Sequence, residues 1–149
     1  MACNRIRSRR DFLKQTGAVI AGGAVLPQSA MAVNTAPKKV RIGVVGGGFG
    51  TSFQWHEHPD CVVQAVSDLR EGRRQQLMKV YGCSKAYNSL EELVLAKDID
   101  AVAVFTDGPL HVQHTIEAMK NGKHVISAVP AAWATIEQAE LLLDTVRKY

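Results

Sequence analysis

Two patterns of hydrophobic and polar positions alternate along residues 40–149. Short runs of β-branched and other apolar residues recur, and the longer segments between them carry apolar residues every three or four positions. The runs are typical of strands buried in a parallel sheet, and the spaced pattern is typical of amphipathic helices. The sequence therefore predicts an α/β fold built on a parallel sheet.

Strands and helices are expected in strict alternation. Strands are predicted at residues 40–45, 61–67, 86–88, 99–105 and 123–127, and helices at 52–58, 73–81, 90–96, 110–121 and 136–148. Ser89 and Glu92 form a capping box for the third helix, and glycines follow the second and fourth helices as C-caps. The last helix is expected to present a stripe to the sheet, made of Ala139, Leu142, Leu143 and Val146.

A glycine-rich turn follows the first strand. Gly46 permits a tight turn, and Gly48 lets the backbone approach a pyrophosphate at the start of the next helix. Gly50 and the small Thr51 let that helix lie close to the strand, although Thr51 fills the third place of the G-x-G-x-x-G pattern. Asp68 ends the second strand twenty residues past Gly48, where an acid can bind ribose hydroxyls. Strand, turn, helix, strand and acid in this order predict dinucleotide binding.

The residues after Asp68 bear on the choice of cofactor. Arg70, Arg73 and Arg74 follow it, and a guanidinium beside the adenosine ribose can hold a 2′-phosphate. The carboxylate of Asp68 would repel that phosphate. We therefore favour NAD over NADP.

Two further loops are predicted at the same edge of the sheet. Thr106 to Pro109 follow the fourth strand, and Ala128 to Trp133 follow the fifth. Ligands of open α/β sheets bind outside the carboxyl ends of the strands. His111, in the first turn of the next helix, is expected to reach into the cofactor cleft, whereas His114 is expected to pack or to face water.

The N-terminus predicts an export signal at residues 1–32. Five basic residues and one acid open the chain, and Ser8 to Lys14 are similar to the twin-arginine motif. An apolar segment at residues 17–26, too short to span a bilayer, leads to a cleavage site after Ala32. Residues 33–39 are then a linker, and the predicted location of the mature protein is periplasmic or extracytoplasmic, without a membrane anchor.

Removal of the signal changes the charge. The whole chain has 18 Lys and Arg against 14 Asp and Glu, of which residues 1–32 hold 5 and 1, so 13 face 13 in the remainder. A neutral mature domain gives no support to nucleic acid as a partner. Cys61 and Cys83 lack neighbouring histidines at ligand spacing, so no metal site is predicted.

Residues 40–149 resemble the N-terminal domain of the Gfo/Idh/MocA oxidoreductases. The matching stretches are Ile42 to Gly50, Ser67-Asp68, Val104 to Thr106 with His111, and Asn121 to Ile126. The resemblance implies a doubly wound parallel sheet, the Rossmann fold, that binds NAD(P), and a sugar or cyclitol as substrate, with a homo-oligomer as a further option. The expected cofactor-binding residues are Gly46, Gly48, Phe49, Gly50, Thr51, Asp68, Leu69, Arg73, Thr106, Pro109, His111 and Ala128.

Two departures from the family pattern keep the activity open. Where the family has Glu-Lys-Pro, this chain has Ala128-Val129-Pro130, and Val129 cannot transfer the proton that the lysine handles. We therefore assign no catalytic residue. The run Val129 to Ala132 is similar to NAD-dependent α-N-acetylgalactosaminidases of the same superfamily, so a glycosidase and an inactive nucleotide-binding paralogue stay as alternatives.

The second departure is length. The family's sixth strand and its C-terminal α+β substrate domain have no counterpart in these 149 residues, so we expect the chain to be a fragment or a truncated product.

Overall fold

The computed structural model describes residues 38–149, so the expected signal peptide and most of the expected linker lie outside the described residues. The strands are β1 (Val40–Val45), β2 (Cys61–Ser67), β3 (Lys85–Tyr87), β4 (Ala101–Val104) and β5 (His124–Ser127). The helices are α2 (Glu71–Tyr81), α3 (Leu90–Val94), α4 (His111–Lys120) and α5 (Ile136–Lys148), with short 3₁₀ turns η1 (Gly50–Ser52), η2 (Trp55–Glu57) and η3 (Gly108–Leu110).

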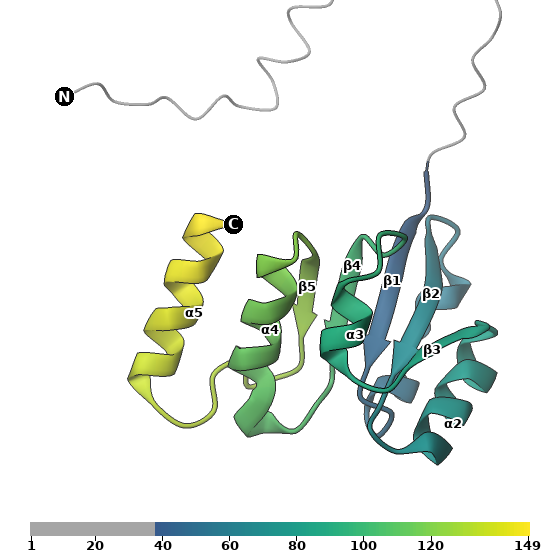
Figure 1. The fold of residues 1–149 in the computed structure, drawn as a ribbon, viewed down its shortest axis with the longest axis horizontal. Coiled ribbons are helices and arrows are strands. Elements are labelled where there is room, and N and C mark those ends of the chain that lie inside the picture. The colour runs from purple at the N-terminus through teal and green to yellow at the C-terminus, as the bar shows by residue number, and fades with distance from the viewer. Residues whose placement is uncertain (1–37) are drawn as a thin grey trace, which may run out of the picture. The chain divides into compact units, whose positions relative to one another are not determined.

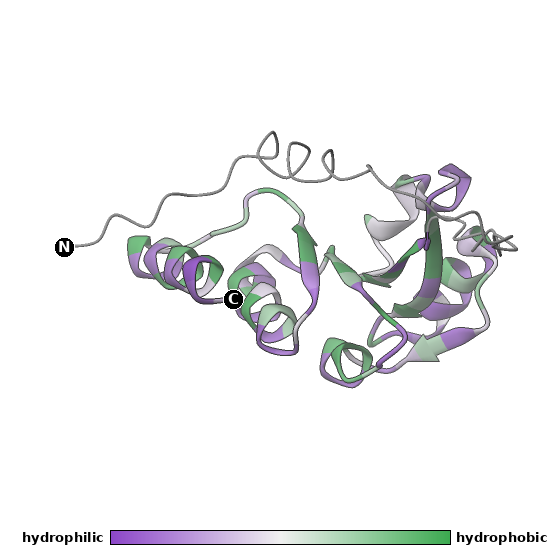
Figure 2. Cartoon of the chain, turned by 90° about the horizontal axis from the view of Figure 1, so that it is seen from above, coloured by the Kyte–Doolittle hydropathy of each residue, from purple (hydrophilic) through white to green (hydrophobic). Residues whose placement is uncertain are grey.

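The five strands form one parallel sheet in the order β3-β2-β1-β4-β5 (Figure 1). The chain moves outward from β1 to β3 and then crosses back to β4, so the strand order reverses between β1 and β4. This arrangement confirms the predicted doubly wound Rossmann-type sheet. The central strands carry buried residues such as Val44 and Val102 on both faces, which explains their nearly continuous apolar sequence (Figure 2).

Helices cover the two faces of the sheet with separate cores. On one face, Leu93 of α3 and Ala118 of α4 pack with Val102. On the other, Leu77 of α2 packs with Val66, together with the segment that contains η1 and η2. Full burial of one such aliphatic side chain contributes about 1.5–3 kcal/mol, so the two cores hold the strand ends in place.

The helix expected at residues 52–58 is wrong. Two 3₁₀ turns replace it, because Phe53 between them is extended (φ −110°, ψ 142°) and turns its ring toward the sheet. The rings of Phe53 and Phe105 stack with their centroids 4.5 Å apart. The ring of Trp55 also stacks on Phe53, with a centroid distance of 5.4 Å. Aromatic packing thus replaces the turn-by-turn continuation of a helix.

The expected packing of α5 on the sheet is also wrong. Thr145 is the buried residue of this helix, whereas Leu143 and Val146 are 49% and 57% exposed. The helix lies beside α4 and away from the strands (Figure 1). Among residues 38–149, β5 is the edge strand on this side and α4 already covers it, so α5 packs against α4.

The remaining element boundaries differ from the predicted ones by two residues or fewer. No helix within residues 38–149 combines the length and the hydropathy needed to cross a membrane.

Candidate functional site

A cleft of about 290 Å³ opens at the carboxyl edge of the sheet, where the strand order reverses. The ends of β1, β2 and β4, the start of α3 and the first residues around α4 all contribute to it. Open α/β sheets bind ligands at this position. The lining residues are Val45, Gly46, Ser67, Asp68, Leu69, Arg70, Arg73, Ser89, Leu90, Glu91, Phe105, Thr106, Asp107, Leu110 and His114.

The glycine turn is packed tightly against the end of β4. Gly46 has φ +100°, and a Cβ atom on it would lie 2.2 Å from the carbonyl oxygen of Phe105. Its N–H donates to the Ser67 carbonyl at 2.9 Å, and its own carbonyl accepts from Gly50 N–H at 3.0 Å. Only glycine meets both the steric and the dihedral requirement, so the turn has one available geometry.

The next N–H groups of the turn are arranged to receive an anion. Gly47 N–H donates to Asp68 Oδ2 at 2.7 Å, whereas the N–H groups of Gly48 and Phe49 have no acceptor among residues 38–149. Gly48 is exposed, and the nearest atom to a Cβ built on it is Arg73 Nη1 at 3.4 Å. Two free N–H groups beside a guanidinium form a cradle that fits a phosphate. The cradle does not depend on a helix dipole, because no α-helix follows it.

Asp68 is held by the backbone on both sides. Its Oδ1 accepts from Arg70 N–H at 2.8 Å, while Oδ2 accepts from Gly47 as described above. A carboxylate has about four lone-pair directions, so this side chain keeps acceptor capacity for hydroxyl groups. Arg74 Nη1 donates to the Asp68 and Leu69 carbonyls at 2.7 and 3.2 Å, which ties this guanidinium to the loop.

The opposite wall of the cleft carries His114. Its Nδ1 lies 2.8 Å from Thr106 Oγ1, and the ring is half-buried. Burial lowers the pKa of His114, an effect that the nearby Glu91 carboxylate opposes. The histidine expected to pack or to face water is a lining residue of the cleft.

His111 is buried next to the cleft wall. The side chain is 4% exposed and is not among the lining residues. Its Nε2 lies 2.8 Å from the Thr106 carbonyl and its Nδ1 lies 2.8 Å from the Pro130 carbonyl. The ring therefore links the loop after β4 to the loop after β5.

Five of the twelve predicted cofactor-binding residues line the cleft, namely Gly46, Asp68, Leu69, Arg73 and Thr106. Gly48 and Phe49 form the adjoining cradle, and Gly50 and Thr51 continue it into η1. Pro109 lies in η3, and Ala128 packs against the core through the side chain while its N–H donates to Val104. Whether the twelve contact a cofactor stays a prediction.

Sequence reasoning did not predict that the segment Ser89 to Glu91 lines the cleft. It opens α3 immediately after β3, and β3 lies next to β2 in the sheet. A signal was present, because the start of a capped helix after a parallel strand falls at the carboxyl edge as the glycine turn does.

The fold and the cleft together define a nucleotide-binding domain of the Rossmann type. The model of the family described as "Oxidoreductase family, NAD-binding Rossmann fold" matches residues 40–149. The chain belongs to this Gfo/Idh/MocA family.

Two curated relatives show the range of activities among similar proteins. D-glucoside 3-dehydrogenase of Escherichia coli (strain K12) is 35% identical over 89 residues, which cover 60% of this chain and 25% of that protein. Glycosyl hydrolase family 109 protein 1 of Bacteroides thetaiotaomicron is 31% identical over 121 residues, which cover 73% of this chain and 26% of that protein. The chain thus spans about a quarter of the length of these relatives.

Solved structures share the fold and differ in cofactor. Scyllo-inositol dehydrogenase from Lactobacillus casei with bound NAD(H) and scyllo-inositol has a TM-score of 0.69 at 25% identity, covering 74% of this chain and 34% of that chain. The 3-ketoreductase KijD10 from Actinomadura kijaniata, in complex with NADP and TDP-benzene, has a TM-score of 0.67 at 25% identity, covering 74% and 35%. The fold therefore accommodates either dinucleotide.

Proposed function

We propose that residues 40–149 bind NAD, and that they are the nucleotide-binding domain of an exported oxidoreductase that acts on a sugar or cyclitol. The observation that carries the proposal is the cradle of Gly48 and Phe49 N–H groups beside Arg73, at the strand-order reversal of the sheet. The names of the dehydrogenases among the relatives support the substrate class. The expected export signal lies outside the described residues and enters as part of the proposal.

Each part of the cleft has a role in this proposal. The cradle and Arg73 hold the diphosphate, and Asp68 accepts hydrogen bonds from the adenosine ribose. Leu69, 82% exposed, offers apolar surface to the adenine. NAD, when bound, would supply the hydride acceptor, while the residues of this chain bind and orient it.

The preference for NAD rests on the charges around Asp68. Its carboxylate would repel a 2′-phosphate, and Arg74 is already bonded to two backbone carbonyls. Arg73 lies against Gly47 and Gly48, on the diphosphate side of the cleft. Of these two guanidinium groups, Arg73 is therefore positioned for the diphosphate, and Arg74 is already engaged by the loop.

Calorimetric titration of the chain with NAD and NADP tests the proposal. We expect saturable binding of NAD and weaker binding of NADP. Gly48→Val should weaken NAD binding at least ~30-fold, because the new side chain fills the approach to the free N–H groups. The fold should be retained, since the atoms nearest to the new Cβ belong to the flexible end of the Arg73 side chain. Gly72→Val is the matched control, since Gly72 has no atom within 4 Å of an added Cβ. Equal NAD affinity in Gly48→Val and the parent would show that the cleft is not the cofactor site.

A specific observation favours a second candidate, an NAD-dependent glycosidase. Val129 to Ala132 resemble a run of the NAD-dependent α-N-acetylgalactosaminidases, although Ala128 replaces the acid of that motif, and several family 109 glycosyl hydrolases are among the relatives. Val129 stands where the family's proton-transferring lysine is expected and has no titratable group. The alternative is a nucleotide-binding paralogue without activity.

One assay separates these candidates. The protein encoded by the longest open reading frame that contains this sequence is incubated with p-nitrophenyl glycosides and, separately, with free sugars and NAD. Net NADH formation supports the dehydrogenase, and phenol release without net NADH supports the glycosidase. NAD binding with neither product supports the inactive paralogue.

The export part of the proposal is tested by cell fractionation. The chain is expected in the extracytoplasmic fraction, and replacing Arg9 and Arg10 by lysines should retain it in the cytoplasm. Retention of the unchanged chain in the cytoplasm would overturn export without affecting the proposed cofactor site.

A further inference from the structure

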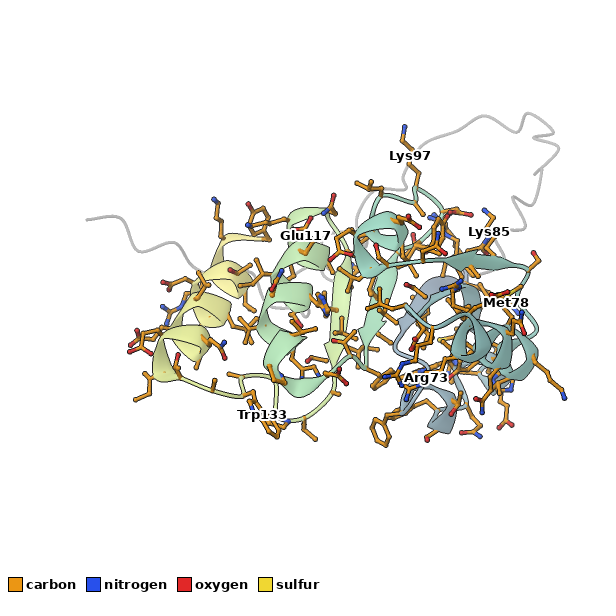
Figure 3. All side chains as sticks on the ribbon, turned by 60° about the horizontal axis from the view of Figure 1, so that its bottom comes forward. Arg73, Met78, Lys85, Lys97, Glu117 and Trp133 are labelled. Atoms are coloured by element: carbon orange, nitrogen blue, oxygen red, sulfur yellow. The ribbon has the colours of Figure 1, made fainter. Side chains whose placement is uncertain are left out.

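The loop after β5 carries an aromatic surface that the cofactor site does not use. Trp133 is 58% exposed and projects from the carboxyl edge of the sheet, on the same side as Arg73 of α2 (Figure 3). Indole rings are mostly removed from water when they serve only to pack a core. A half-exposed tryptophan at the edge where ligands bind calls for a different explanation.

The position of this ring is fixed by backbone. A Cβ atom on Gly108 would lie 2.7 Å from Trp133 Cε3 and 3.0 Å from Cδ2, so the ring rests directly on the main chain of η3. Any larger residue at 108 would push the ring away. One side of the indole therefore packs on the main chain of η3, and the rest of the ring stays open to solvent.

The loop that bears Trp133 is anchored to the end of β4 and to α4. Ala128 N–H donates to the Val104 carbonyl at 2.9 Å, and the Pro130 carbonyl lies 2.8 Å from His111 Nδ1. The other ring nitrogen of His111 lies 2.8 Å from the Thr106 carbonyl, which belongs to the cleft. One buried histidine thus sets the spacing between the aromatic surface and the cleft wall.

Both apolar and polar side chains lie in the segments next to the Trp133 ring. Gly108 lies between Asp107 and Leu110 in η3 and its cap, and both of these line the cleft. Leu110 is 39% exposed, and Val129, earlier in the Trp133 loop, is 89% exposed. Asp107 supplies an exposed carboxylate that can accept hydrogen bonds from hydroxyl groups.

This combination matches the chemistry of a ring sugar. A pyranose or cyclitol chair presents C–H groups on its faces and hydroxyl groups around its rim. A flat apolar surface next to fixed acceptors serves both at once, as in small-molecule sites lined by aromatic groups with a few placed polar atoms. Linear polyols have the same hydroxyls but no such face.

We infer that Trp133 is a substrate-binding residue, against which the C–H face of a pyranose or cyclitol ring packs beside the cofactor cleft. The inference rests on the proposed function and deepens it, because it names the residue that recognises the ring. It assigns no proton transfer to Trp133 or Val129. It makes His111 a positioning residue for this surface.

The chain contains two tryptophans, which allows a direct readout. Trp55→Phe leaves Trp133 as the sole indole and keeps the aromatic stack, and it removes a buried Nε1 that has no partner among the described residues. In this variant with NAD bound, Trp133 fluorescence should change saturably with methyl β-D-glucoside or myo-inositol. Sorbitol, a linear polyol, should leave it unchanged.

Affinity measurements on variants complete the test. Trp133→Ala should weaken binding of the ring ligands at least ~10-fold by ligand-observed NMR, and Trp133→Phe should restore most of it. NAD affinity should stay within ~2-fold of the parent in both variants. Tyr149→Ala is the matched control, as another exposed aromatic residue.

The outcomes distinguish this inference from the proposed function. Absence of NAD binding in the parent chain overturns the proposed function and the inference with it. With NAD bound, ring ligands that do not bind the parent, or that bind Trp133→Ala as they bind the parent, overturn the inference alone. A loss of NAD affinity in Trp133→Ala also overturns it, since Trp133 would then belong to the cofactor site.

Discussion

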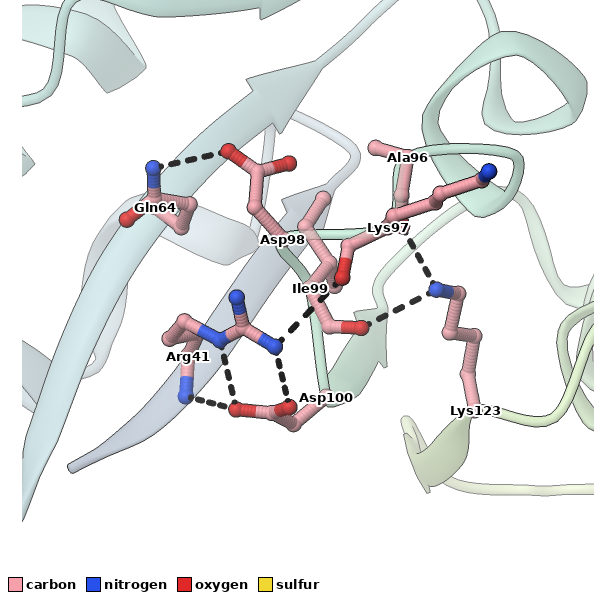
Figure 4. Close-up of polar contacts among 8 residues, drawn as sticks. All are labelled: Arg41, Gln64, Ala96, Lys97, Asp98, Ile99, Asp100 and Lys123. Atoms are coloured by element: carbon pink, nitrogen blue, oxygen red, sulfur yellow. Dashed lines mark hydrogen bonds and ion pairs between the residues drawn. The ribbon is translucent and has the colours of Figure 1, made fainter. Parts of the chain in front are cut away.

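The two edges of the sheet use polar groups in opposite ways. At the amino edge, where the strands begin, the charged side chains bind one another and nearby carbonyls (Figure 4). At the carboxyl edge, where the strands end, N–H groups stay free and apolar side chains stay exposed. The contrast separates the part of the fold that maintains structure from the part that is available to ligands.

Arg41 and Asp100 are at the centre of the amino edge. Arg41 Nη2 and Nε donate to the two carboxylate oxygens at 2.6 and 2.9 Å, and Arg41 N–H adds a third bond at 3.0 Å. Lys123 Nζ donates to the Ala96 and Ile99 carbonyls at 2.6 and 3.0 Å. These bonds connect β1, the residue before β5 and the loop before β4. The charged groups of Arg41, Asp100 and Lys123 are therefore paired within the fold.

The carboxyl edge has the opposite character. Gly48 and Phe49 N–H have no acceptor within residues 38–149, and the buried Oγ of Ser67 also lacks a partner there. Val129 and Trp133 expose apolar surface at the same edge. Unpaired polar groups and exposed apolar groups both lower stability, and their concentration at one edge is the usual sign of a binding site.

The largest effect is expected from the glycine turn. Gly46→Ala should lower the free energy of unfolding by about 3 kcal/mol or more, because φ is +100° and the new Cβ would collide with backbone at 2.2 Å. Gly82→Ala is the control: φ is +63° but nothing lies within 4 Å, so a cost near 1 kcal/mol is expected. Urea denaturation measures both. Equal costs would mean that the turn is not held by Phe105.

The amino edge should respond next, and with a pH dependence. Hydrogen bonds from Arg41 hold the pKa of Asp100 well below its ordinary value. Asp100→Ala should cost about 1–2 kcal/mol at neutral pH, a figure already reduced for partial exposure.

The sign follows from the lowered pKa of Asp100. Its contribution is complete above the unfolded value of about 4 and is lost as the pH falls toward the folded value, so parent and variant should converge in acid. Asp144→Ala, which removes an exposed pair with Arg147 at 3.5 Å, should change stability little at any pH. A pH-independent difference between parent and Asp100→Ala would contradict the assignment.

Cofactor choice should shift by a smaller amount. Asp68→Asn removes the negative charge that opposes a 2′-phosphate, so the ratio of NAD to NADP affinity should fall about 10-fold. Asp107→Asn, on the other wall of the cleft, should alter both affinities alike. Parallel titrations of the two variants with each dinucleotide give the ratios, and an unchanged ratio in Asp68→Asn would remove Asp68 from the ribose site.

The smallest effect has the opposite sign. Ser67→Ala should leave the free energy of unfolding unchanged or raise it by up to about 0.5–1 kcal/mol, because it removes a buried hydroxyl without a partner among the described residues. Gln64→Ala, at the amino edge, should cost a similar amount, since it breaks a 3.0 Å bond to Asp98. Equal destabilisation in the two variants would remove the distinction between the edges.

Local signals predicted much of this fold. The apolar runs located four of the five strands, and the caps Ser89, Thr135 and Gly82 located helix ends because each acts within a few residues. The glycine turn and Asp68 were found for the same reason. Their mutual contact at 2.7 Å follows from the parallel pairing of β1 and β2.

Features that depend on distant partners were not predictable. The segment 52–58 has helical spacing, but Phe53 turns out to pack on Phe105, fifty-two positions away in the chain. The orientation of α5 depends on what lies beside β5. The burial of His111 depends on the carbonyl of Pro130, which no local pattern places beside α4.

The stack of Phe53 on Phe105 has a mechanical consequence. Phe105 is joined covalently to Thr106, and Phe49 meets both stacked rings edge-on at 5.3 and 5.7 Å. The phosphate cradle, through Phe49, and the residue after β4, Phe105, therefore belong to one aromatic cluster with Phe53. Removal of the Phe49 ring is therefore expected to weaken the packing of Phe53 and Phe105 together, on both sides of the cleft.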